Sequence, residues 1–118
     1  MIINSKNKHE FEKLDLHDAE LLDINCDYRN QTVLISTMLN IPNQKSSMLN
    51  LMFKDISFFS ISCQQSWGSG FYFFEASIDD SLENNVNLES DCSKIKFLII
   101  LNSGDQIKIE SSCMKVYC

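Results

Sequence analysis

Alanine, glycine, proline and arginine are all scarce in this chain of 118 residues. Ala19 and Ala76 are the only alanines, so the strongest helix former is nearly missing. Ile and Phe, which favour strands, are common by contrast. No internal repeat and no linker interrupts the sequence, and the single proline, Pro42, lies in a short predicted loop. The composition therefore favours a β-rich chain.

An excess of positive charge is also missing. The formal net charge is -6, Arg29 is the only arginine, and the lysines are scattered. Nucleic-acid binding normally needs a basic face that displaces counterions from phosphates, so we expect no nucleic-acid partner. An acidic surface suits a basic protein partner instead. With 44% hydrophobic and 22% charged residues, the chain fits one folded domain that spans residues 1–118.

Apolar runs long enough to cross a membrane are absent, as is an apolar signal-peptide segment after Met1. We therefore expect a cytoplasmic protein with no membrane partner. The five cysteines are odd in number and show no C-x-x-C spacing, which indicates free thiols rather than a disulfide framework. Zinc ligands usually occur in closely spaced pairs, and only Cys113 and Cys118 come close. We expect no metal and no other cofactor.

Alternation of apolar and polar residues is the main structural signal, and it predicts strands. The predicted strands are 22–28, 32–39, 48–54, 56–63, 71–78, 94–101, 106–110 and 113–118, of which 94–101 is instead a strongly apolar run. In the first segment one face is shared by Leu22, Ile24, Cys26 and Tyr28. The phase slips near Phe58 and Phe59, which predicts a β-bulge. Cys26 and Cys63 fall on apolar faces, so we expect their thiols to be buried and inert.

These segments predict a mainly β chain with a single antiparallel domain of seven or eight strands. A sandwich, a half-open barrel and a strongly curved sheet all fit this pattern. At most one short helix is expected, either near the N-terminus, where Phe11 and Leu14 are three residues apart, or within 79–93. Residues 1–15 are expected to form a flexible or partly helical arm.

His17 and Asp18 form a candidate polar site just before the first clear strand. An adjacent imidazole and carboxylate could act as a base with its orienting group, or as two metal ligands. Neighbours in a strand point to opposite faces, however, so they would not converge on one substrate atom. The favoured interpretation is structural, with Asp18 shaping a turn and His17 bonding to a neighbouring strand. No catalytic residue is assigned.

Trp67 and an acidic segment are the candidates for partner binding. Trp67 lies in a loop between Gly68 and the preceding polar residues, and tryptophan often anchors protein interfaces. The alternative is a tight connection with Trp67 folded over an edge of the core. The acidic cluster comprises Asp79, Asp80, Glu83, Glu89 and Asp91. It could be a docking surface for a basic protein, and a solvated loop is the plainer alternative.

Three sets of residues together carry a resemblance. They are Leu16-His17-Asp18-Ala19, then Phe53-Lys54-Asp55-Ile56 followed by Ser62-Cys63 and Trp67-Gly68-x-Gly70, and finally Asn102-Ser103-Gly104-Asp105-x-Ile107-x-Ile109. The arrangement resembles small uncharacterised bacterial β-rich proteins of the YxiG-like kind, some of which are thought to be immunity proteins in toxin systems. The resemblance spans residues 14–118 and implies no catalytic residues. The acidic insert at 79–93 departs from its compact pattern.

The leading hypothesis is a non-enzymatic binding protein, of the immunity type, that binds a basic, toxin-like protein. Trp67 would be the anchor, and Asp79, Asp80 and Glu83 would supply the complementary charge. One alternative is a small-ligand-binding barrel or small enzyme with a pocket near His17 and Trp67. Another is a homo-oligomeric module, such as a homodimer formed by exposed strand edges.

Overall fold

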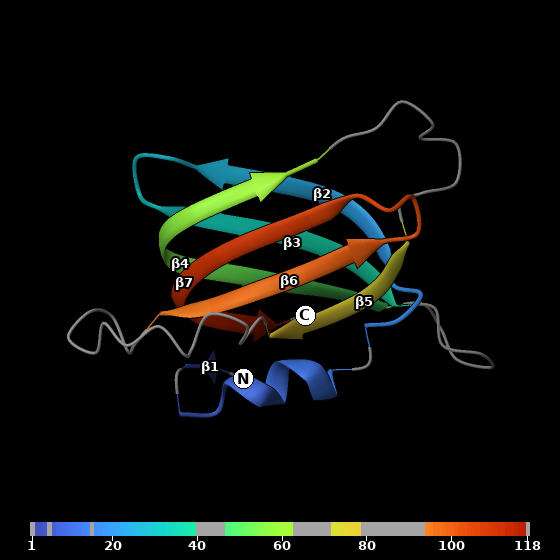
Figure 1. Ribbon diagram of the computed structural model, residues 1–118, viewed down its shortest axis with the longest axis horizontal. Helices are drawn as coiled ribbons and strands as arrows, with labels where there is room; N and C mark the ends of the chain where they lie inside the picture. The colour runs from blue at the N-terminus through green and yellow to red at the C-terminus, as the bar shows by residue number, and fades with distance from the viewer. Residues whose placement is uncertain are drawn as a thin grey trace.

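The computed structural model describes residues 2–4, 6–14, 16–39, 47–62, 72–78 and 94–117. In these ranges the chain forms one antiparallel sheet of seven strands and one short 3-10 helix. The elements are β1 (Ile2–Ile3), η1 (Lys8–Lys13), β2 (Glu20–Asp27), β3 (Thr32–Leu39), β4 (Ser47–Ile61), β5 (Phe73–Ile78), β6 (Ile95–Leu101) and β7 (Gln106–Tyr117). Their spatial order is β2-β3-β4-β7-β6-β5, with β1 beside β7 (Figure 1). The predicted mainly β, antiparallel fold is confirmed.

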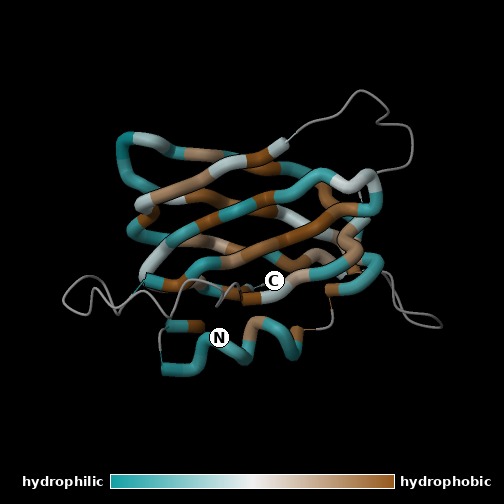
Figure 2. The backbone as a smooth tube through the Cα atoms, in the orientation of Figure 1, coloured by the Kyte–Doolittle hydropathy of each residue, from teal (hydrophilic) through white to brown (hydrophobic). Residues whose placement is uncertain are grey.

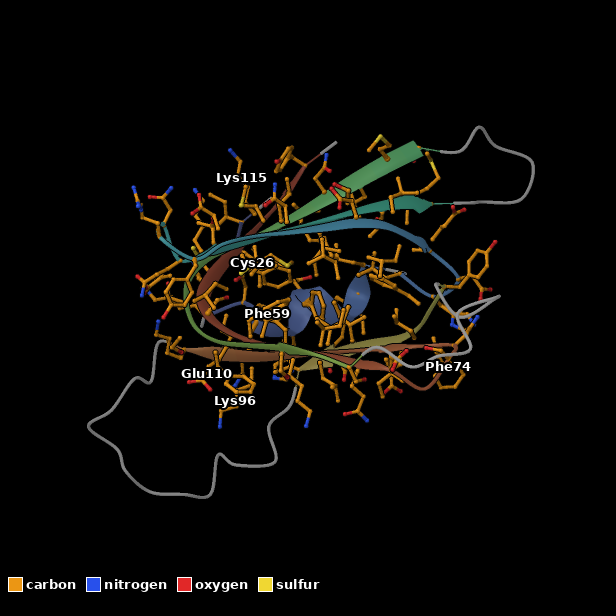
Figure 3. The ribbon with its side chains drawn as sticks, turned by 90° about the horizontal axis from the view of Figure 1, so that it is seen from above. Cys26, Phe59, Phe74, Lys96, Glu110 and Lys115 are labelled. Atoms are coloured by element: carbon orange, nitrogen blue, oxygen red, sulfur yellow. The ribbon has the colours of Figure 1, made fainter. Side chains whose placement is uncertain are left out.

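Two long strands, β4 and β7, pair with each other and belong to both halves of the sheet. The first half of β4 also pairs with β3, and the end of β7 also pairs with β1. The first half of β7 pairs instead with β6. The sheet therefore doubles back into two facing layers (Figure 3). The back layer contains β1, β2 and β3, and the front layer contains β5 and β6, so the sheet is open and strongly curved.

The bend of β4 has local causes at its centre. Asp55 has a φ of 55°, and the register against β7 shifts between Ile56 and Phe58. A bulge of this kind bends a strand and increases its twist without ending it. The predicted bulge is therefore confirmed, next to the phase slip. The separate strands predicted at 48–54 and 56–63 are wrong, because they are one bent strand, and the same holds for 106–110 and 113–118.

The core fills the space between the two layers. Figure 2 shows apolar and polar residues alternating along the strands, and β6 is almost continuously hydrophobic. Phe97 of β6 meets Phe53 of β4 and Phe11 of η1, each edge to face with ring centroids 4.9 Å apart. Such edge-to-face pairs add to the stabilisation from burial alone. This aromatic row links the front layer, the back layer and the N-terminal helix.

Helix η1 closes the lower opening between the two layers, below the sheet in Figure 1. Phe11 is only 1% exposed, and the carboxylate of Glu12 accepts a hydrogen bond from the backbone N–H of Ile78, at 3.1 Å. The predicted short helix near the N-terminus is therefore confirmed. The alternative place for a helix, within 79–93, lies outside the described residues.

The face predicted for Leu22, Ile24, Cys26 and Tyr28 is partly wrong. A register shift between Leu21 and Asp23 places Leu21 and Ile24 against the core and leaves Leu22 exposed. Cys26 is opposite Val33, on the inner side of the sheet, but it lies at the open end of the layers and is exposed. The expected burial of its thiol is therefore wrong. Cys63 lies outside the described residues.

Substituting Phe11→Ala should lower the free energy of unfolding by about 3–5 kcal/mol, because it removes a large buried side chain that contacts Phe97. Urea denaturation followed by circular dichroism would measure the loss. Phe58→Ala is the matched control, because Phe58 is 49% exposed and its truncation should cost much less. Equal effects of the two substitutions would show that η1 does not close the core.

Candidate functional site

Leu16, His17, Asp18 and Ala19 form a tight turn before β2. The N–H of Ala19 donates to the carbonyl oxygen of Leu16 at 3.0 Å, and both of these side chains are buried. Asp18 has a φ of 67°, in the left-handed region that asparagine and aspartate tolerate better than most residues. The apolar ends of the motif thus anchor the turn, and its polar centre faces solvent.

This turn ties the start of β2 to the start of β5. The N–H of Asp18 donates to the carbonyl oxygen of Phe73, and the N–H of Phe73 donates to that of Ala19, both at 2.8 Å. His17 Nδ1 donates to the carbonyl oxygen of Phe74 at 2.9 Å. A bridge between Glu20 and Tyr72 follows. The turn therefore joins the two outer strands of the open sheet at one corner.

His17 and Asp18 do come together, although sequence reasoning expected them to diverge. His17 Nε2 lies 3.7 Å from Asp18 Oδ2, and both side chains are more than half exposed. The left-handed backbone at Asp18 is the reason, because alternation of side-chain directions holds only for extended residues. Among the described residues, no third His, Cys, Asp or Glu joins them in a metal-binding group. The pair fits the structural role predicted for it.

A groove opens along the upper side of the molecule, between β2 with its hairpin and the second half of β4. Its volume is about 830 Å³. The residues that line it are Cys26, Asp27, Tyr28, Arg29, Gln31, Thr32, Val33, Ile56, Ser57, Phe58 and Phe59. Figure 3, which views the molecule from above, shows Cys26 and Phe59 directed toward the space between the layers. Helix η1 fills the lower opening, and the groove is its counterpart at the upper one.

Two aromatic side chains are the most exposed apolar groups of the groove. Tyr28 is 92% exposed, at the tip of the β2–β3 hairpin, and Phe58 is 49% exposed beside the bulge of β4. Both belong to segments held in place by the backbone, since the N–H of Ile56 donates to the carbonyl oxygen of Gln31 at 3.0 Å. The groove thus presents aromatic surface on a fixed frame, as protein-binding sites often do.

Asp27 adds a carboxylate to the groove. Its Oδ2 accepts a hydrogen bond from the side-chain amide of Asn30 at 2.8 Å, and its Oδ1 accepts one from the backbone N–H at 3.2 Å. These bonds, the amide bond first, hold the pKa of Asp27 below its ordinary value. Asp27 therefore stays ionised while it shapes the hairpin turn, and Arg29 follows two residues later.

A second carboxylate, Asp55, stabilises the bend that forms the groove. Lys94 Nζ lies 3.1 Å from Asp55 Oδ2 and donates to the carbonyl oxygen of Asp55 at 2.7 Å. Hydrogen bonds from Lys94 and then from Ser112 hold the pKa of Asp55 below its ordinary value. This contact joins β4, β7 and the start of β6 at the corner where the sheet turns.

The sequence pointed to other partner-binding residues than the groove. Trp67, Asp79, Asp80 and Glu83 lie outside the described residues. The groove residues were missed, since they come from the β2–β3 hairpin and from the bulge of β4, which are 23 or more residues apart in the chain. The available signal was the position of two aromatic residues, Tyr28 at a predicted turn and Phe58 at the phase slip.

Substituting Asp18→Val should destabilise the protein by about 1–2 kcal/mol, because a β-branched side chain disfavours a positive φ. Asp18→Gly, which removes the same carboxylate but fits the left-handed backbone, should be close to neutral. Thermal unfolding of both variants would separate the two effects. Similar losses for valine and glycine would mean that the carboxylate, and not the backbone geometry, is what matters at this turn.

Asp55→Asn should destabilise the protein at neutral pH, because it removes the charge that Lys94 stabilises but keeps a side chain that tolerates φ > 0. A carboxyl group with a lowered pKa in the folded state contributes stability above its ordinary pKa of 3.8, and this is lost as the pH falls through the folded-state value. The difference from the wild type should therefore shrink in acid. Urea titrations at a series of pH values would measure it, and a difference that is constant with pH would contradict the assignment.

Of the helices in the described ranges, none is long and apolar enough to cross a bilayer. Comparison of the chain with known proteins gives no matching family model and no match among curated proteins.

Proposed function

We propose that this chain is a non-enzymatic binding protein of the immunity type, which captures a basic, toxin-like protein in its upper groove. The observation that carries the proposal is the exposed aromatic surface of Tyr28 and Phe58 on a groove with the ionised carboxylate of Asp27. Exposed aromatic side chains on a rigid frame are typical anchors of protein interfaces. A basic side chain of the partner would pair with Asp27 at the rim.

The distribution of charge along the sequence supports a basic partner. The chain has 16 acidic and 10 basic residues, and the segment 79–93 contains five of the acidic ones and no lysine or arginine. The remaining 103 residues therefore have 11 acidic and 10 basic residues, a net charge of -1. Five of the six net negative charges belong to this one segment, and concentrated charge raises the rate at which an opposite partner is captured.

The sequence resemblance described above agrees with this proposal, since some proteins of the YxiG-like kind are thought to be immunity proteins. In this proposal Trp67 is a further anchor, and Asp79, Asp80 and Glu83 supply long-range attraction. The groove supplies short-range contacts. Under this proposal the partner is a protein, and neither a nucleic acid nor a membrane is bound. Its site of action would be the cytoplasm.

A small organic ligand is the second candidate for the groove. A volume of about 830 Å³ lies within the range of roughly 300–1,000 Å³ that small-molecule sites occupy. The polar groups that could orient such a ligand are Asp27, Arg29 and Ser57. His17 and Asp18, which sequence reasoning placed beside a pocket, are not among the lining residues. A ligand site would therefore depend on a different set of residues from the one first considered.

The proposal is tested with a partner captured from the native host and then purified, so that one-to-one binding is measured directly. Tyr28→Ala combined with Phe58→Ala should raise the dissociation rate about tenfold or more, the usual effect of removing aromatic anchors. Reversing Asp79, Asp80 and Glu83 to lysine should lower the association rate, and added salt should reduce the difference.

The matched control reverses Glu10, Glu20 and Glu75 to lysine, which changes the net charge equally at places outside the groove lining. An equal fall in the association rate of this control would mean that only the overall charge matters. An unchanged dissociation rate of the double aromatic variant would exclude the groove as the binding site. A partner that proves to be neutral or acidic would contradict the proposed function itself.

A further inference from the structure

The outer side of the back layer differs from the outer side of the front layer. Opposed residues of antiparallel strands share a face, so the register places the outward side chains in rows across the strands. From β2 to β7 these rows are Asp27–Thr32–Lys54–Cys113, Asn25–Leu34–Met52–Lys115, Asp23–Ser36–Asn50–Tyr117, and Glu20–Met38–Met48 on β2 to β4. Ile2 of β1 extends the second row beside Lys115. We call this surface the back face.

The centre of the back face is apolar. Its apolar residues are Leu34, Met38, Met48, Met52 and Tyr117, and Met48 and Tyr117 are exposed. The one polar pair among them is satisfied internally, since the hydroxyl of Ser36 donates to the amide oxygen of Asn50 at 3.1 Å. Three methionines make this surface adaptable, because their side chains repack easily against a partner.

The outward side of the front layer also carries apolar residues, Leu98 and Ile100 of β6 and Phe58 of β4, but charged residues lie directly beside them. Outward residues of its central strands include Lys96, Lys108 and Glu110, with Gln106 beside them. Figure 3 shows Lys96 and Glu110 close together on this side and Lys115 on the opposite side of the molecule. Opposite charges next to each other are typical of a face that stays in water. The two faces therefore differ in where their charges lie, since the front layer has lysine and glutamate among its apolar residues and the back face has its charges at the borders.

The charges on the back face are separated by sign. The β2 border carries Glu20, Asp23 and Asp27, and β2 contains no lysine or arginine. The other side carries Lys54 on β4 and Lys115 on β7, and Lys115 Nζ lies 5.8 Å from the ring centre of Tyr117. An acidic border on one side and a basic border on the other is a self-complementary arrangement.

We propose that the back face binds a second copy of this chain, which gives a two-fold symmetric dimer. Rotation by 180° about an axis parallel to the strands, between β3 and β4, lays β2 of one copy over β7 of the other and β3 over β4. Lys115 of one copy then lies opposite Asn25 of the other copy, and the neighbouring outward residues on that strand are Asp23 and Asp27. Both ends of the interface gain the same contacts, as two-fold symmetry requires.

The size of the back face sets the expected affinity. Four strands about 4.8 Å apart and four rows about 6.8 Å apart give a patch of roughly 20 by 20 Å. This is about half of the roughly 800 Å² per partner that stable complexes bury, so the dimer should be weak and form in the micromolar range. The groove shares only Asp27 and Thr32 with the back face, and the dimer does not depend on the proposed function.

Sedimentation of the purified chain over a wide range of concentrations would test the dimer, with reductant present because Cys26 and Cys113 are free thiols. The wild type should pass from monomer to dimer, and added salt should weaken the dimer. Met52→Lys, at the centre of the back face, should leave only monomer. A wild type that stays monomeric at the highest concentration would overturn the proposal.

A charge exchange tests the orientation of the two copies without disturbing the core. Lys115→Glu should weaken the dimer about tenfold, and Asp23→Lys added to it should restore much of the loss. Lys108→Glu makes the same charge change on the front layer and should have no effect. A dimer that none of the back-face variants weakens would overturn the proposal. If the wild type is monomeric and the Met52→Lys substitution abolishes binding of a different protein, the dimer is excluded and the back face is the binding surface for that protein.

Discussion

The pairing of β4 with β7 is the interaction on which the rest of this structure depends. Among the described strands it is the only pair that runs through both layers, and each of the other described strands is attached directly or indirectly to one half of it. A flat pair would leave the inner faces of β3 and β6 exposed, because neither would meet an opposing layer. The bulge after Ile56 and the left-handed Asp55 turn the pair back, and the Lys94 contact stabilises that turn. The hydrophobic core therefore exists because one strand pair bends.

A sheet that doubles back without closing leaves two openings, and this chain treats them differently. Phe11 of η1 fills the lower one and extends the aromatic row of the core. The upper one is lined by Tyr28 and Phe58, and no described strand lies between β2 and the second half of β4 there. An open end with exposed aromatic side chains leaves apolar surface in contact with water, which is unfavourable. A partner that covers the groove would remove that cost, which is why we place recognition at the upper opening.

Local pattern was sufficient to predict some elements and not others. Alternation predicted β3 with its correct bounds, since 32–39 contains no bulge. It failed at β2, because the extra residue between Leu21 and Asp23 puts the side chains before it and after it out of phase with each other. It also divided β4 and β7, because a bend and a strand end both interrupt a pattern of period two. Whether an interruption bends a strand or ends it depends on distant residues such as Lys94, which no local window contains.

The same limit explains what could be predicted about the candidate sites. The turn at His17 and Asp18 could be assigned a structural role from residue types alone, because its chemistry is local. The groove and the back face both depend on register, which brings β2 next to segments far away in sequence. β2 borders both surfaces, so the proposed dimer would place Asp23 opposite a lysine of the second copy and neutralise part of that border. The acidic residues of 79–93 would then supply most of the electrostatic attraction on a basic partner at long range. Different residues, those of the groove, would make the short-range contacts.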